Sequence, residues 1–216
     1  MISLFAFTQW LLLAIAGAAI SGLAKWQIWK QTYLKWFVIY LCILTCAVAT
    51  GDALVDYKLI KEFELLNQSV VVLEILFINW FFYQTLSSSG QKIIIIAGCA
   101  LYLTSLALEF FFIDSKDYYF ESLSYAVGNL AVLIYLIMFF IRLANSSHII
   151  NFYRQTTFWI ALGMLVFYLG TFPFYGLYNE LIKNLKIFEP LAWASTTLNY
   201  IMYIFFSIAL LWGKHN

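Results

Sequence analysis

Residues 93–113 read IIIIAGCALYLTSLALEFFFI, a run in which Glu109 is the one charged side chain. A helix that rises about 1.5 Å per residue crosses the roughly 30 Å hydrocarbon layer of a bilayer in about 20 residues, so this run predicts a transmembrane helix. The same pattern recurs along the chain. It predicts seven spans, at 3–24, 36–57, 68–86, 93–113, 122–143, 158–177 and 190–213.

The composition of the whole chain also indicates a bilayer as its solvent. Of the 216 residues, 64% are hydrophobic and 11% are charged, whereas soluble domains have about 45–50% and about 25%. A formal net charge of +1, with no dense basic stretch, argues against nucleic acid as a partner. Only short loops and tails remain outside the spans. We therefore expect one all-α polytopic bundle over residues 1–216, with the lipid bilayer as its immediate partner.

Charged residues outside the spans separate by side. The opposite loops and span ends hold many acidic residues, while one set of loops and the C-terminal tail carry only basic ones: Lys25, Lys30, Lys35, Lys92, Arg142, Arg154 and Lys214. Cytoplasmic loops are enriched in Lys and Arg, so we expect the N-terminus outside and the C-terminus in the cytoplasm. The first span has no basic residue before it and is expected to stay in the mature protein.

Three short matches at a nearly constant offset suggest an internal repeat. Residues 30–32, 59–61 and 73–74 match 154–156, 181–183 and 198–199 at equivalent places in the topology. Two three-helix units in the same orientation need one helix between them, so the fourth span would link a 3+1+3 parallel repeat, as in some transporters. Chance similarity between apolar segments is the alternative explanation.

Polar side chains inside the spans are the candidate ligand-binding residues, because in hydrocarbon each needs a partner or a water-filled cavity. Glu74 interrupts the run VVVLEILF at 70–77, and no Lys or Arg lies in the interior of a span to pair with it, since Arg142 stands at the very end of the fifth span. The helical rise places it about 9 Å below the outer edge of its span. Helical spacing sorts the others into stripes that we expect to face the bundle axis. The predicted binding residues are Glu74, Asp52, Glu109, Asn129, Tyr125, Tyr168, Asn199 and Tyr203.

Together these residues predict a polar cup that opens outward above an almost wholly apolar inner half. Asp52, for example, continues a stripe with Thr45, Ala49 and Asp56 on the second span. The alternative is that the amides and hydroxyls only hold helices together, at about 0.6 kcal/mol for each hydrogen bond. For Glu74 both interpretations stay open.

Several classes of chemistry have no support in the sequence. No lysine lies inside a span, so a retinal Schiff base is not expected. His148 and His215 both fall on the predicted cytoplasmic side, away from the acids, so we expect no metal centre of the kind that needs three protein ligands. No nucleophile motif or catalytic triad is present. An aspartyl-type intramembrane site formed by Asp52 and Glu74 stays open as an alternative, although no motif supports it. We expect no catalytic residue, no metal and no cofactor, and not an enzyme.

Two aromatic stretches carry a family resemblance. Residues 158–170, FWIALGMLVFYLG, and 198–203, LNYIMY, together with the acid of the third span, resemble uncharacterised small seven-helix inner-membrane proteins of Bacteroidota. This resemblance implies a multi-pass protein of the bacterial inner membrane. The helix count is similar to that of opsins and the 3+1+3 plan to that of SWEET sugar transporters. The chain lacks a retinal lysine and, with only Pro173 and Pro190, the paired proline motifs of SWEET proteins.

Three functions fit these observations. The first is a receptor-like or sensor-like module that binds a small ligand from outside and signals through a separate partner or membrane complex. The alternatives are a transporter or channel for a small solute or cation, and a structural subunit of a membrane complex. A transporter must open a wet path through the apolar inner half, whereas a receptor need not. We expect that half to contain Cys42, Cys46, Phe81, Phe82, Phe139 and Phe140.

Overall fold

The structure is a computed structural model that describes residues 4–112, 122–145 and 154–213. Over these residues the chain forms helices joined by short connections, without a strand, which confirms an all-α architecture. Two of the helices are single turns, α2 (Trp26–Trp29) and α8 (Tyr178–Leu181). The long helices are α1 (Leu4–Ala24), α3 (Leu34–Asp56), α4 (Ile60–Thr85), α5 (Ser89–Phe112), α6 (Ser122–Ala144), α7 (Thr156–Gly176) and α9 (Leu185–Trp212).

Six of the described helices, α3 to α7 and α9, are long and apolar enough to cross a membrane. They confirm a polytopic membrane protein. The described side chains of α1, Trp10–Ala24, form a shorter apolar helix, so the seventh span stays a prediction. The helix α4 begins at Ile60, eight residues before the predicted span. Helix formation does not require apolar residues, and Glu and Lys are good helix formers, so the charged first turns extend the helix.

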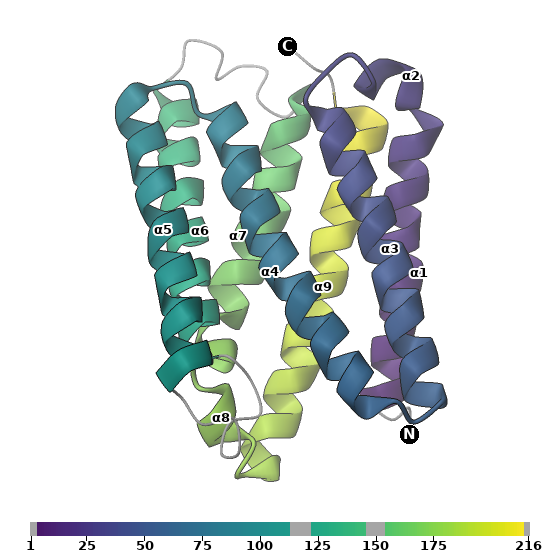
Figure 1. Ribbon diagram of the computed structural model, residues 1–216. Coiled ribbons are helices and arrows are strands. Elements are labelled where there is room, and N and C mark those ends of the chain that lie inside the picture. The colour runs from purple at the N-terminus through teal and green to yellow at the C-terminus, as the bar shows by residue number, and fades with distance from the viewer. Residues whose placement is uncertain (1–3, 113–121, 146–153, 214–216) are drawn as a thin grey trace.

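The long helices form a closed ring with one helix outside it. In the order α1, α3, α4, α6, α7 and α9, each helix packs on the next, and α9 packs back on α1. The helix α5 lies beside α6 and also touches α4 (Figure 1). The contact of α7 with α9 is the most extensive, whereas α4 packs much less closely on each of its neighbours. The ring therefore encloses an interior. Among the helices around it, α4 is the least tightly packed.

One end of the bundle carries α2 and the connection between α4 and α5, and α8 lies at the opposite end (Figure 1). The basic residues Lys25, Lys30, Lys35, Lys92 and Arg142 stand in or next to the connections at the first end, which we call the basic end. There the guanidinium of Arg142 donates to the Thr85 carbonyl at 3.1 Å, and the Lys92 ammonium lies 4.7 Å from the centre of the Tyr83 ring. Lys214 lies outside the described residues. The described loops thus show the predicted separation of charge, and the orientation of the bundle in a membrane stays a prediction.

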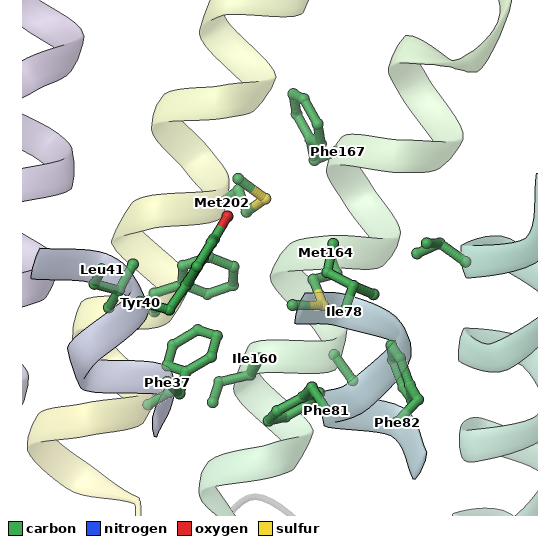
Figure 2. Packing of buried hydrophobic residues seen from close by; sticks show 14 of the residues in the cluster. Phe37, Tyr40, Leu41, Ile78, Phe81, Phe82, Ile160, Met164, Phe167 and Met202 are labelled. Atoms are coloured by element: carbon green, nitrogen blue, oxygen red, sulfur yellow. The ribbon is translucent and has the colours of Figure 1, made fainter. Parts of the chain in front are cut away.

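A buried aromatic layer fills the interior toward the basic end. The Phe37 ring lies 5.7 Å from that of Phe81 and 5.1 Å from that of Phe206. Phe82 and Ile160 complete this layer, and all five side chains are buried (Figure 2). We call these five residues the apolar layer. Dense packing of this kind leaves no room for water, so the interior is closed on the basic side.

The other residues of the predicted apolar inner half divide between core and surface. Phe139 is buried and Phe140 is half-buried. Cys42 is half-buried and Cys46 is exposed. A path through the bundle therefore has to open the aromatic side chains, and the Cys46 thiol does not line it.

One polar network in the core has a purely structural role. The Tyr135 hydroxyl contacts the Asn79 side-chain oxygen at 2.9 Å and the Ile95 carbonyl at 3.1 Å. The Asn79 amide nitrogen in turn donates to the Ile75 carbonyl at 2.8 Å. Three helices, α4, α5 and α6, meet through these groups. They hold the bundle together in the way that polar groups commonly do between membrane helices.

Candidate functional site

Glu74 is held by a hydrogen bond that crosses the interior of the bundle. The Tyr168 hydroxyl on α7 donates to the Glu74 Oε1 on α4 at 2.6 Å. In the ring α6 lies between these two helices, so both side chains reach into the interior to meet. Glu74 lies about 21 Å from the start of α4 and about 16 Å from its end, because each residue adds about 1.5 Å. The carboxyl group is therefore near the middle of the helix.

Four more tyrosines lie within electrostatic range of the carboxyl group. Tyr40 on α3, Tyr125 on α6, Tyr175 on α7 and Tyr203 on α9 each interact electrostatically with Glu74. We call Glu74, Tyr168 and these four tyrosines the Glu74 cluster. Among the residues that the structure describes, no Lys or Arg contributes to the electrostatic surroundings of Glu74. The cluster thus offers a carboxyl group without a basic partner, surrounded by phenol groups.

Polar groups continue from the cluster toward the α8 end of the bundle. The Tyr125 and Tyr175 rings lie 4.7 Å apart, and the Ser195 hydroxyl lies 3.3 Å from that of Tyr175. The Tyr175 ring is also nearly parallel to the Tyr178 ring of α8, at 6.5 Å. On the other side the apolar layer begins directly, and the Tyr40 hydroxyl points away from Phe37 (Figure 2). The interior is therefore polar toward α8 and apolar toward the basic end.

Two amide side chains near the cluster have polar atoms without partners. Asn129 is fully buried, lies one turn after Tyr125 on α6 and is close to its hydroxyl. Neither its side-chain oxygen nor its nitrogen makes a hydrogen bond of good geometry to the described residues, and the same holds for the Asn199 oxygen. Buried polar atoms nearly always bond to protein, water or a ligand. These atoms can therefore pair with a water molecule or a ligand, in contrast to the fully paired Asn79.

The structure brings together five of the eight predicted binding residues: Glu74, Tyr125, Asn129, Tyr168 and Tyr203. Asn199 lies one turn before Tyr203 on α9, on the same helical face. Asp52 and Glu109 lie elsewhere, and their surroundings give each a different role.

The stripe predicted on α3 does not face the bundle axis, so that prediction was wrong. Ala49 and Asp56 are exposed, and Asp52 is only half-buried. The buried face of α3 is instead formed by Phe37, Leu41 and other large apolar side chains. Such side chains gain the most from packing inside a bundle, which leaves the small and polar stripe on the outside.

Glu109 is buried and serves as a cap for the next helix. Its two carboxylate oxygens accept hydrogen bonds from the backbone N–H groups of Leu123 and Ser124, each at 2.8 Å. These groups lie in the first turn of α6, where N–H groups have no partner inside the helix and a negative charge is favourable. The carboxylate is thus occupied by the backbone.

We expect Glu109→Gln to lower the stability of the fold without changing ligand binding at the Glu74 cluster. A glutamine has one acceptor oxygen in place of two and no charge, so the loss should be about 1 kcal/mol, as for other helix caps. Thermal unfolding in detergent measures this loss, with Asp52→Asn as a control that should change little. A stable Glu109→Gln variant that has lost binding would instead place Glu109 in the ligand site.

Sequence reasoning missed Tyr40 as a site residue, whereas helical spacing placed Tyr175 and Ser195 on stripes expected to face the bundle axis without counting them among the predicted binding residues. Tyr175 had a usable signal, because it follows Tyr168 by seven residues and therefore shares its helical face. Tyr40 had none, since it stands in an apolar run near the basic end. Within the described ranges no group of His, Cys, Asp and Glu could hold a metal ion. His148 and His215 lie outside those ranges.

No family model, curated protein or solved structure matches the chain. Its function is therefore inferred from the chemistry of the Glu74 cluster.

Proposed function

We propose that this membrane protein is a receptor-like module that binds a small organic cation with N–H groups at the Glu74 cluster. Glu74 has no basic partner among the described residues, so a cation with N–H donors is its natural complement. The surrounding tyrosine rings suit a cation as well, because the faces of aromatic rings attract positive charge. The Asn129 side chain, which lies close to the Tyr125 hydroxyl but makes no hydrogen bond of good geometry to the described residues, can accept or donate a further hydrogen bond. The proposed role is binding without chemical conversion.

The polarity difference along the bundle axis supports a receptor in particular. A ligand that enters from the α8 end meets tyrosines and Ser195 before it reaches Glu74, and the apolar layer blocks its passage beyond. By the positive-inside rule the α8 end faces outward and the basic end faces the cytoplasm. We place the protein in the bacterial inner membrane, with a separate signalling partner or membrane complex on its basic side.

A transporter for the same cation is the second candidate, and the helix arrangement favours it. The ring contains α1, α3 and α4 followed by α6, α7 and α9, with α5 outside. This order is compatible with a 3+1+3 repeat of two three-helix units and one linking helix. Transport would need the apolar layer to open, so flux separates the two candidates.

The experiment uses the full chain and butylguanidinium, which stays charged at every accessible pH. For the receptor we expect saturable binding in lipid nanodiscs, measured by calorimetry, and no uptake into proteoliposomes above that of protein-free vesicles. Uptake that Glu74→Gln abolishes would favour the transporter. Absence of binding at millimolar concentration would overturn both proposals and leave the role of a structural subunit.

A further inference from the structure

A groove of about 880 Å³ runs across the outer face of α4, between α3 and α5. Leu73 and Leu76 on α4 are both exposed in it. Gln68 and Ser69 provide its few polar atoms, and its other lining includes Trp36, Ile43, Leu106 and Phe110. The volume is that of a typical binding site for a small molecule. Because all three helices are apolar enough to cross a membrane, the groove opens toward lipid hydrocarbon.

The groove and the Glu74 cluster share a wall. Tyr40 lines the groove and also interacts with Glu74. Its ring stacks on that of Phe77, another lining residue, with 4.2 Å between centres and 4° between planes. Glu74 precedes Phe77 by three residues, which places the two about 60° apart around the helix. One pair of stacked rings therefore separates the half-buried carboxyl group from the groove.

We infer that the ligand is an amphiphile, with an N–H-bearing cationic head at Glu74 and a single alkyl chain in the groove. This inference rests on the proposed function and adds the chemical class of the ligand. Ordinary lipid chains also fit an apolar groove. An alkyl chain, however, gains little free energy when it moves from the bilayer to a groove of apolar side chains. Specific binding therefore needs the charge, and Glu74 supplies it beside the groove. Because the stacked Tyr40 and Phe77 rings separate the two sites, the head reaches Glu74 from the groove when these rings part.

The test uses dodecylguanidinium with a photoreactive diazirine at the end of its chain, added to the full-length protein in nanodiscs. After illumination, mass spectrometry identifies the labelled peptides. We expect labelling of groove residues on α3, α4 and α5. It should fall about tenfold in Glu74→Gln, because a hydrogen bond to a charged group is lost. It should fall similarly in Leu76→Trp, which fills the groove at an exposed position.

A matched control distinguishes the groove from the rest of the lipid-facing surface. Leu130→Trp adds the same bulk at another exposed position on α6, outside the groove, and should leave the labelling unchanged. Equal labelling in wild type and Glu74→Gln would show that the groove holds any lipid chain, which overturns the inference. Cross-links between two copies of the chain at the groove would overturn it too.

A second measurement keeps failure of this inference distinct from failure of the proposed function. Butylguanidinium has a chain too short to fill the groove, so it should bind wild type and Leu76→Trp equally. If butylguanidinium binds but the long probe labels no groove residue, the cation site stands and the amphiphile is wrong. If neither compound binds, the proposed function fails and this inference fails with it.

Discussion

Replacing Glu74 with glutamine should weaken the binding of butylguanidinium by about tenfold or more. The substitution removes the negative charge, and a hydrogen bond to a charged group contributes about 1.5–3 kcal/mol. Glutamine keeps an oxygen that can accept the hydrogen bond from Tyr168, so the fold should persist. Calorimetric titration in nanodiscs measures the affinity, and thermal unfolding checks that the variant is folded.

Two further variants show whether the charge or the hydrogen bond matters. Glu62→Gln makes the same change at an exposed position in the first turn of α4 and should leave the affinity unchanged. Tyr168→Phe keeps the charged carboxyl group but removes its donor, and should change the affinity by less than Glu74→Gln does, because the charge that attracts the cation is still present. Equal affinity of wild type and Glu74→Gln would remove Glu74 from the binding site.

The second large effect is expected at the tightest helix contact. A Cβ atom at Gly163 on α7 would lie 2.8 Å from the Phe205 Cβ and 3.1 Å from the Met202 carbonyl oxygen, both on α9. Neither atom can move away by rotation of a side chain, so Gly163→Ala must push the helices apart. Overpacking of this kind costs about 1–3 kcal/mol. We expect a clearly lower midpoint of thermal unfolding in detergent.

Gly17 offers the matched control for this substitution. No atom lies within 4 Å of a Cβ built at Gly17 on α1, so alanine meets no obstacle there. Its higher helix propensity should raise stability by up to about 1 kcal/mol. An unchanged unfolding midpoint in Gly163→Ala would show that α7 and α9 are not packed this closely.

The helices were predictable because an apolar run of membrane-spanning length has few alternatives to a helix. Their ends and faces were harder to predict. The start of α4 lies in the charged segment that contains Glu62 and Glu64, where the hydropathy of the run gives no signal. On α3, polar spacing suggested a face through Asp52, but the large side chains of Phe37 and Leu41 occupy the interior.

The candidate site was predictable only in part, because sequence spacing shows which residues share a face but not which helices meet. Glu74 stood out because no basic residue could pair with it. Its partner Tyr168 is 94 residues away, and only the closed ring brings the two together. Glu109 shows the opposite case. Its burial was predictable, yet its role depends on the first turn of α6 lying against the end of α5.

The hydrogen bond between Glu74 and Tyr168 also bears on how the chain assembles during synthesis. Glu74 enters the bilayer with the first half of the protein, while its donor is made 94 residues later. Until the second half is inserted, the carboxyl group has only water or lipid headgroups as partners. A carboxyl group inside the membrane costs much free energy under these conditions. Insertion of the later helices removes that cost. The N-terminal half is therefore stably embedded in the membrane only after the C-terminal half has been inserted.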